Sequence, residues 1–285
     1  MALISIQDVS KLYGFGDATT IALDDVSFDV EKKEFIAIMG PSGSGKSTLM
    51  NIIGLLDHPS HGNYKLNDRF VSRLSSNQKA KIRRDTIGFI FQSFNLLPRL
   101  TVLENVSLPL AYKGKSRVQR LKQASEMLER IGLQDREYFY PHQLSGGQIQ
   151  RVAIARALIN NPSIIIADEP TGNLDSESSR AIMELLTEIN KSGNTVLMVT
   201  HNPTLTRHAN RVVYMHDGYI IHDEKSKFGE IPSILQKSMY SVKNKAADDA
   251  AGVSSLMKTL PGDLKKDEKT PKAKTNKKRK AKARK

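Results

Sequence analysis

The sequence predicts an α/β protein with a strand-rich N-terminal part, a helical lobe inserted into its core and a basic C-terminal tail. Segments with the apolar alternation of strands interchange with segments of helical periodicity along most of the chain. A glycine-rich loop follows an apolar strand and precedes a helix. Residues 265–285 hold 12 Lys and Arg against 2 Asp and Glu, so this tail carries most of the net charge of +13. The rest of the chain is nearly neutral.

Residues 1–91 are expected to be rich in strands. Their β-branched or alternating runs are separated by turns that contain Gly, Asp and Asn. The runs lie at residues 3–9, 21–30, 34–39 and 87–91. A short helix is expected at residues 47–55, directly after the glycine-rich loop.

From residue 100 to residue 159 the periodicity becomes helical, which predicts a helical subdomain over about residues 93–160. Strands are expected to return afterwards, with one helix between the first two. On that helix the apolar residues fall at i, i+3, i+4 and i+7, which predicts one buried stripe. The stripe consists of Ile182, Leu185, Leu186 and Ile189. The strands are expected at residues 163–168, 195–200, 211–215 and 219–221.

The folded domain is therefore expected to span residues 1–240, with a last weak helix at residues 231–240. Residues 241–285 are polar, small and finally Lys/Arg-rich from residue 265, which is typical of a disordered segment. No apolar run approaches the roughly 20 residues of a membrane span, and the first residues lack the pattern of a signal peptide. The chain is expected in the cytoplasm. Because it has no cysteine, disulfides and thiolate chemistry are excluded.

The glycine-rich loop has the composition and the setting of a phosphate-binding loop. It consists of Gly40, Pro41, Ser42, Gly43, Ser44, Gly45, Lys46, Ser47 and Thr48. Backbone amides of such a loop and the positive end of the following helix point at an anion. Lys46 is expected to reach the β and γ phosphates of a nucleotide, and the Ser47 hydroxyl to bind Mg²⁺. This segment predicts a P-loop NTPase core.

Two carboxylates, Asp168 and Glu169, end an apolar run. If that run is a parallel strand, they lie at the edge of the sheet where ligands of α/β folds bind. We expect Asp168 to hold Mg²⁺ through water, and Glu169 to polarise the attacking water as a general base. The alternative is an acidic turn without function. The presence of the phosphate loop favours the functional interpretation.

A second glycine motif opens the helix expected at residues 149–158. It consists of Leu144, Ser145, Gly146, Gly147 and Gln148. Its glycines expose amides at a helix N-terminus and so predict a second anion site. One nucleotide rarely needs two anion-binding sites of this kind from the same chain. The motif therefore indicates a site for a nucleotide that another copy of the chain holds, although a glycine-containing helix cap is the plainer interpretation.

Over roughly residues 3–224 these motifs, in this order, resemble the ATP-binding-cassette (ABC) ATPases. The resemblance implies a homodimer in which two cassettes sandwich two ATP molecules, each between one phosphate loop and the partner's signature motif. It implies that Tyr13 stacks on adenine, that Gln92 contacts Mg²⁺ and water, and that His201 senses the γ phosphate. The segment Asn173, Leu174 and Asp175 resembles the D-loop, which crosses the dimer interface.

Three further segments narrow the resemblance to one group of ABC ATPases. Residues 53–57, 91–98 and 171–175 are similar to the ATPases of macrolide exporters, lipoprotein-releasing complexes and the cell-division pair. This implies an ATPase that drives a separate integral-membrane permease from the inner face of the cell membrane, in an exporter or a mechanotransmission-type complex. The loop at residues 92–98 is expected to contact the permease through apolar side chains, unless these pack inside the lobe. They are Phe94, Leu96 and Leu97, with Leu100 just beyond.

Two other functions remain open. The Lys-rich tail would suit a soluble ABC ATPase that acts on nucleic acid or the ribosome, but such proteins usually carry two cassettes or a long coiled-coil insertion, and the sequence offers neither. A regulatory module that uses ATP only as a clamp would be expected to lack Glu169 or His201. The tail itself is expected to bind anionic lipid, nucleic acid, or nothing at all.

Overall fold

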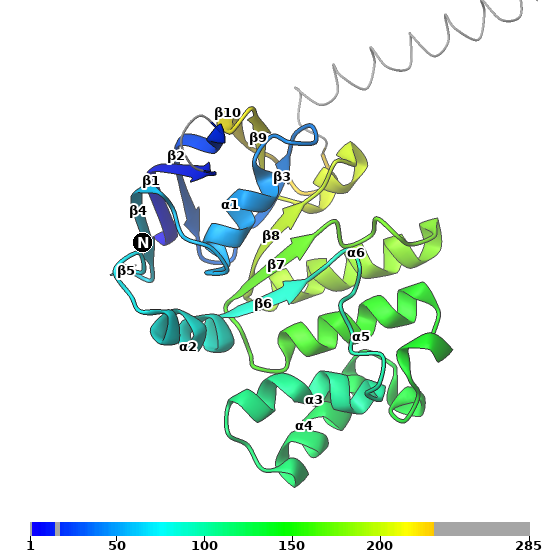
Figure 1. Ribbon diagram of the computed structural model, residues 1–285. Helices are drawn as coiled ribbons and strands as arrows, with labels where there is room; N and C mark the ends of the chain where they lie inside the picture. Colours follow the sequence, from blue (N-terminus) through cyan, green and yellow to red (C-terminus); the bar gives the residue numbers. More distant parts are fainter. Residues whose placement is uncertain (1, 15–17, 231–285) are drawn as a thin grey trace, which may run out of the picture. The chain divides into compact units, whose positions relative to one another are not determined.

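The computed structural model describes residues 2–14 and 18–230 and contains two sheets (Figure 1). The first is antiparallel, with the order β2-β1-β4-β5. Its strands are β1 (Ala2–Tyr13), β2 (Thr20–Glu31), β4 (His61–Leu66) and β5 (Arg69–Phe70). The second has the order β10-β9-β3-β8-β7-β6, parallel except for β10. Its strands are β3 (Phe35–Met39), β6 (Ile87–Ile90), β7 (Ile164–Asp168), β8 (Thr195–Val199), β9 (Arg211–His216) and β10 (Tyr219–Lys225).

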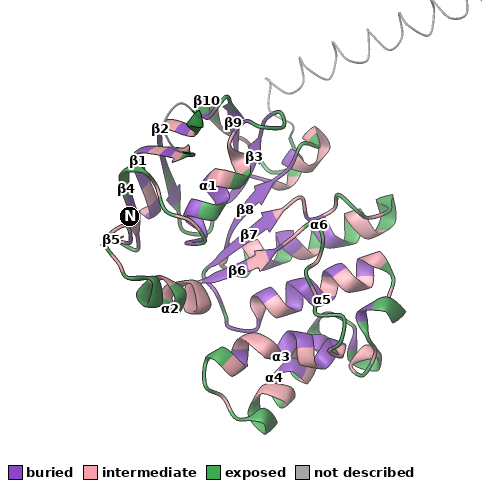
Figure 2. Cartoon of the chain, viewed as in Figure 1, coloured by how far each residue is buried: buried purple, intermediate pink, exposed green. Residues whose placement is uncertain are grey.

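The central strands β3, β8 and β7 are buried on both faces (Figure 2). Alternate residues of β3 belong to different apolar clusters: Ile36 and Ile38 to one, Phe35, Ala37 and Met39 to the other. Because a strand that is covered on both faces cannot use polar residues on either, these runs are continuously apolar. Parallel pairing brings the carboxyl ends of the three strands to one edge of the sheet.

Helices cover both faces of this sheet. The helix α1 (Lys46–Ile53) buries Leu49, Met50, Ile52 and Ile53 in the first cluster. The helices α5 (Gly146–Leu158) and α6 (Ser176–Lys191) contribute to the second cluster, and α6 does so through the predicted stripe at Ile182, Leu185, Leu186 and Ile189. The stripe was therefore predicted correctly.

The helical lobe has an apolar cluster of its own. The helices α3 (Val102–Tyr112) and α4 (Arg117–Arg130) pack there with residues of α5, including Val152 and Ala155. The helices α3, α4 and α5 each begin with a capping box, at Thr101, Ser116 and Ser145. Such caps satisfy the free amides of a first turn, so the starts of the helices are defined locally.

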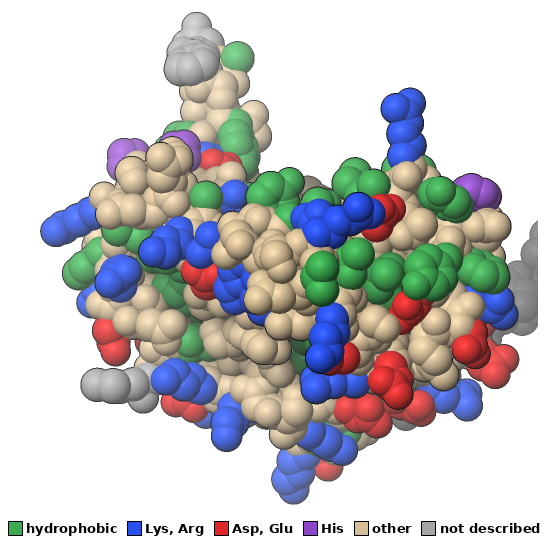
Figure 3. All heavy atoms as spheres, turned by 90° about the horizontal axis from the view of Figure 1, so that it is seen from below, with side chains coloured by type: hydrophobic (Ala, Val, Ile, Leu, Met, Phe, Trp, Pro, Cys, Tyr) green, Lys and Arg blue, Asp and Glu red, His purple; other side chains and the backbone are tan. Residues whose placement is uncertain are grey.

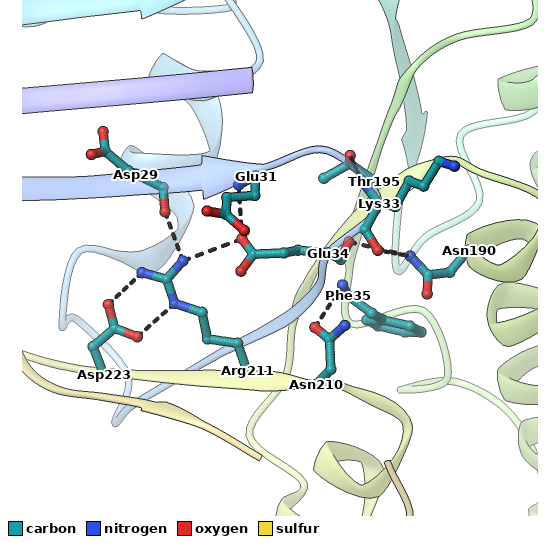
Figure 4. A network of polar contacts seen from close by, with 10 residues as sticks. All are labelled: Asp29, Glu31, Lys33, Glu34, Phe35, Asn190, Thr195, Asn210, Arg211 and Asp223. Atoms are coloured by element: carbon teal, nitrogen blue, oxygen red, sulfur yellow. Dashed lines mark hydrogen bonds and ion pairs between the residues drawn. The ribbon is translucent and has the colours of Figure 1, made fainter. Parts of the chain in front are cut away.

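A largely buried arginine, 13% exposed, joins the two sheets at the end opposite the loop after β3 (Figure 4). The Arg211 guanidinium donates to both carboxylate oxygens of Asp223 at 2.7 and 2.6 Å, to the Asp29 carbonyl at 2.7 Å and to Glu34 at 3.2 Å. These bonds connect β9 with β10, with β2 and with the residue before β3. The Asn210 side chain accepts from the Phe35 amide at 3.0 Å. This end of β3 is thereby fixed.

The fold confirms the expected α/β class, with a strand-rich N-terminal part and an inserted helical lobe. Sequence analysis missed α2 (Ser76–Thr86), which lies within residues 1–91, the part expected to be rich in strands. This helix has no buried residue and hence no apolar period, but its capping box at Ser75 and Gln78 starts it. The helix expected at residues 231–240 and the tail at 241–285 lie outside the described residues. Within residues 2–14 and 18–230, no helix has the length and apolar character needed to cross a membrane.

Candidate functional site

The phosphate loop lies between the end of β3 and the start of α1, as the sequence predicts. Gly40 and Gly43 have φ angles of 147° and 82°, which side chains with a Cβ rarely adopt. A Cβ on Gly40 would also collide with the Met215 carbonyl oxygen, whereas one on Gly43 would meet nothing within 4 Å. Gly40 thus closes the loop against the sheet, and the backbone around Gly43 is open to a ligand.

The N-terminus of α1 is unpaired and Lys46 lies beside it. Gly45 precedes the helix without a side-chain cap, and no acidic residue occupies the first turn. The Lys46 ammonium donates to the carbonyls of Gly40 and Pro41 at 2.9 and 2.6 Å and to the Ser44 hydroxyl at 3.2 Å. Free amides, the helix dipole and one cation therefore surround the same concave loop, which fits the phosphates of a nucleotide. Ser42, Ser47 and Thr48 complete this segment.

Glu169 and His201 meet although 32 residues separate them. Glu169 follows β7, and its Oε1 accepts from the His201 amide at 2.9 Å and lies 2.7 Å from His201 Nδ1. The Thr200 hydroxyl donates to the other carboxylate oxygen at 3.3 Å. The Glu169 backbone is left-handed, with φ of 46°, a strained conformation that is enriched in functional sites. The pairing of β7 with β8 creates this contact, since the two residues follow adjacent strands.

Asp168 and Lys46 lie in the electric field of Glu169. Burial raises the pKa of Asp168, and the charge of Glu169 raises it further, while Lys46 opposes both. Burial lowers the pKa of Lys46, against the charges of Glu169 and Asp168. A carboxyl group whose ionisation is disfavoured, beside a second carboxylate and a phosphate-binding loop, forms a place where a further cation is stabilised.

The donor set fits Mg²⁺. This ion is commonly held by one or two carboxylates together with substrate phosphates and waters, and not by a complete protein cage. Asp168 at the end of β7 and Ser47 in the first turn of α1 supply oxygens of that kind. Gln92, just after β6, lies against the loop that follows Glu169: a Cβ on Gly172 would be 2.8 Å from its Nε2. Among the described residues no group of three or more acidic or His side chains could hold a metal alone.

The second glycine motif starts α5, and its serine and glutamine cap that helix. The Ser145 hydroxyl accepts from the Gln148 amide at 3.3 Å, and the Ser145 amide donates to the Gln148 side chain at 3.0 Å. Gly147 is packed so closely that a Cβ would lie 2.7 Å from the Ser178 hydroxyl. Leu144 packs against the cluster of the helical lobe.

Residues 173–175 connect this motif with Gln92. A Cβ on Gly146 would lie 3.3 Å from the Leu174 side chain, and the Asn173 side chain donates to the Gln92 carbonyl at 3.0 Å. Asp175 caps α6 by accepting from the Ser178 amide at 2.9 Å. Residues 173–175 therefore lie against both the second glycine motif and Gln92.

Tyr13 ends β1 and is 42% exposed. Its hydroxyl donates to Asp57 at 2.7 Å and lies near the side chain of Thr48, in the first turn of α1. The ring is thus adjacent to the phosphate loop, where a nucleotide base could reach it.

The loop after Gln92 agrees only in part with the sequence interpretation. Leu97 is exposed, whereas Leu96 packs against the apolar cluster of the helical lobe. Sequence analysis overlooked Arg156, whose guanidinium donates to the carbonyls of Phe94 and Asn95 at 2.9 and 2.5 Å. Both of those residues have positive φ, so Arg156 holds a strained loop. No local pattern marks this arginine, because its partners are 61 and 62 residues away.

Comparisons with known proteins agree with this arrangement. Residues 23–172 match the model of the family described as ABC transporter. The chain is 52% identical to the uncharacterized ABC transporter ATP-binding protein MJ1508 of Methanocaldococcus jannaschii, over 77% of this chain and 98% of that protein. It is 48% identical to the macrolide export ATP-binding/permease protein MacB of Burkholderia thailandensis, over 78% of this chain but only 34% of that protein.

Solved structures lead to the same family. The fold matches the dimeric, post-hydrolysis structure of the ATP-binding cassette MJ0796 bound to ADP and Pi, with a TM-score of 0.73, 46% identity and coverage of 79% of this chain and 99% of that chain. A second dimeric structure of MJ0796, a bacterial ABC transporter cassette, matches at 47% identity with the same TM-score. The family model, these relatives and the geometry of the phosphate loop together establish that the chain belongs to the ABC transporter family.

Proposed function

We propose that this ABC ATPase binds ATP between two copies of the chain and uses hydrolysis to drive a membrane permease. The observation that carries the proposal is the convergence of Lys46, Asp168, Glu169 and His201 at the carboxyl ends of β3, β7 and β8. A phosphate cradle, an acidic pair and a positioned base occur together there. This combination is what phosphoryl transfer to water requires.

The residues of the site divide the work. Lys46 exchanges its carbonyl partners for phosphate oxygens, and the amides at the start of α1 bind the same group. Ser47, Asp168 and Gln92 would hold Mg²⁺, which neutralises charge on the phosphates when it is bound. Glu169 accepts a proton from the attacking water, and His201 orients its carboxylate through the bond at Nδ1. Tyr13 stacks on the base.

The signature motif is proposed to complete the site of a second copy. Its amides at the start of α5 form an anion site separate from the phosphate loop, and Ser145 is exposed. A homodimer with two-fold symmetry pairs each phosphate loop with the partner's signature motif. MJ0796, which is similar over nearly its whole length, is described as dimeric.

Replacing Ser145 with arginine tests the shared site. Ser145→Arg should bind ATP as the wild type does, yet fail to form ATP-dependent dimers in gel filtration. Ser116→Arg is the matched control, because Ser116 is exposed and caps α4 by the same capping box. Normal dimerisation of Ser145→Arg, or equal loss in both variants, would argue against a shared site.

The proposed permease contact is a cavity of about 680 Å³ between α2, β6, α3 and α5. Its walls combine apolar Phe89, Phe91 and Leu108 with cationic Lys81 and Arg156. The underside of the molecule shows further hydrophobic side chains in a row, bordered by charged side chains of both signs (Figure 3). Exposed apolar surface of this kind marks protein contacts. Asn95 lines the cavity and follows Gln92 closely, so a helix that docks there would act on the catalytic loop.

Crosslinking can test this contact cleanly because the chain has no native cysteine. Asn95→Cys and Arg99→Cys should crosslink to a co-expressed permease, whereas Asp217→Cys, in the exposed turn between β9 and β10, should not. A crosslink at Asp217 without one at Asn95 or Arg99 would place the permease elsewhere.

The relatives support an exporter, which we place on the inner face of the membrane. MacB is named for macrolide export, and MJ1508, of which the chain covers 98%, is named as an ABC transporter ATP-binding protein without mention of a permease, which supports a permease on another chain. For the basic segment 265–285 we propose contact with anionic lipid next to the docked cassette. Co-sedimentation of full-length and truncated chains with anionic liposomes and with RNA tests this role. Binding to RNA only would favour the alternative of a nucleic-acid-directed ATPase.

A further inference from the structure

A polar cluster beside Tyr13 lies outside the phosphate loop and the catalytic pair. Lys11, in β1, has a side chain that is only 7% exposed, and its ammonium lies 2.7 Å from Asp57 Oδ1 and 2.8 Å from the His58 carbonyl oxygen. Asp57 uses its second oxygen, Oδ2, to accept from the Tyr13 hydroxyl at 2.7 Å. One carboxylate therefore binds a buried cation and an exposed aromatic residue at once.

The position of Asp57 is set by the turn after α1. Leu55 has a left-handed backbone, and the amides of Leu56 and Asp57 both donate to the Asn51 carbonyl, at 2.8 and 3.1 Å. The same turn is tied to β1, because the Ser60 amide donates to the Ser10 carbonyl at 2.8 Å. The turn that follows the phosphate-loop helix thus places Asp57 beside the end of β1.

The contacts of Tyr13 fix the orientation of its ring. The Lys11 ammonium lies 4.9 Å from the ring centroid, over one face, and the hydroxyl donates to Asp57. Two charged groups, Lys11 and Asp57, therefore restrain a side chain that is 42% exposed. The exposed part of the ring is the surface that a flat ligand can reach.

The charge state of the cluster keeps these contacts in place. Burial raises the pKa of the Asp57 carboxyl, but hydrogen bonds from Lys11, Tyr13 and the His58 amide, with the charge of Lys11, outweigh it and hold that pKa at about 2. Asp57 is consequently an acceptor throughout the physiological range, and the Tyr13 hydroxyl always has a partner.

We propose that Asp57 and Lys11 are positioning residues for nucleotide binding, which hold the Tyr13 ring in the orientation that stacks on the base of ATP without touching the nucleotide themselves. The inference rests on the proposed stacking role of Tyr13. An unrestrained exposed side chain must be ordered when the ligand binds, and that ordering weakens affinity. A ring that is already fixed avoids most of this loss. The cluster therefore sets the affinity for the base and leaves the phosphates unaffected.

Binding of ADP and of inorganic pyrophosphate to the full-length chain separates the two parts of the ligand. Neither compound is hydrolysed, so isothermal titration calorimetry gives both dissociation constants in the presence of Mg²⁺. Asp57→Asn and Lys11→Met should each weaken ADP binding by about three- to tenfold, the range expected for ordering one side chain. Pyrophosphate binding should stay within about twofold, since the phosphate loop is intact. In steady-state assays, KM for ATP should rise by the same factor as the dissociation constant of ADP, while kcat is retained.

Two variants serve as controls. Asp85→Asn removes an ion pair of similar length, 2.8 Å to Arg84, on α2, and should change neither affinity. Tyr13→Ala should weaken ADP binding, and Asp57→Asn added to it should produce no further loss, because the ring through which Asp57 acts is gone.

The outcomes are distinct. If Asp57→Asn weakens ADP and pyrophosphate equally, the cluster supports the whole loop and the inference is wrong. If Tyr13→Ala weakens ADP binding but Asp57→Asn and Lys11→Met do not, the inference fails while the proposed stacking role stands. If Tyr13→Ala binds ADP as the wild type does, the stacking role itself is wrong and the inference falls with it.

Discussion

Replacing Gly172 with alanine should slow ATP hydrolysis without unfolding the protein. An added Cβ would lie 2.8 Å from Gln92 Nε2 and 3.3 Å from Gln92 Cδ and Cγ. Gly172 does not have a positive φ, so its backbone accepts alanine. The only group that must move is the exposed end of the Gln92 side chain, which we propose contacts Mg²⁺ and water.

The size of the effect follows from that displacement. Ordinary van der Waals contact begins at about 3.4 Å, so the amide must move by roughly 0.6 Å or turn away. A shift of about 1 Å in a positioned group can reduce a rate by about 10²-fold, which gives about tenfold for this smaller shift. Stability should change by less than about 1 kcal/mol, because alanine restricts the unfolded chain and the flexible glutamine end relieves the clash. ATP affinity should remain within about twofold, since the phosphate loop is untouched.

Steady-state phosphate release measures the rate of hydrolysis, ATP titration measures the affinity, and urea unfolding measures the stability. The variant Gln92→Ala gives the rate without the glutamine amide. The double variant Gln92→Ala/Gly172→Ala shows whether Gly172→Ala acts only through Gln92. With Gln92 truncated the new methyl group has space, so the double variant should match Gln92→Ala. Wild-type turnover of Gly172→Ala beside an impaired Gln92→Ala would refute the reasoning, as would an additional loss in the double variant.

Four further changes have defined outcomes. Glu169→Gln should retain ATP binding and lose about 10²- to 10⁴-fold in kcat, and turnover near that of the wild type would remove the general-base role. Lys46→Ala should weaken ATP binding by at least about tenfold in a titration, because a charged hydrogen-bond donor to the phosphate oxygens is lost. The folded pKa of Asp57, about 2, lies below the usual value of about 3.9, so its stabilisation is complete above about pH 4 and disappears as the pH falls toward 2; urea unfolding should show this loss in the wild type and not in Asp57→Asn. Truncation after Leu264 should leave ATP hydrolysis unchanged, and a slower truncated enzyme would assign the tail a catalytic role.

The sequence by itself determined those features that depend only on residues close together in the chain. An apolar strand, glycines at fixed spacing and a helix start are all encoded within about 15 residues of one another, so the phosphate loop follows from the sequence alone. The same holds for Ser145, since a capping box needs only residues three positions apart. The apolar stripe of α6 was equally clear, because helical periodicity is a local property. The helix α2 was missed because its start depends on a cap and its surface has no apolar period.

Only the tertiary structure decided which distant residues meet. Glu169 contacts His201, and Gln92 contacts the loop at Gly172, because the strand order β3-β8-β7-β6 differs from the order in the chain. Lys11 and Asp57 find each other only through the pairing of β1 with β4 and the turn after α1. Strand order is selected by burial summed over many apolar residues, and no short segment contains that sum. The positions of the reacting groups are therefore a property of the packed sheet as a whole.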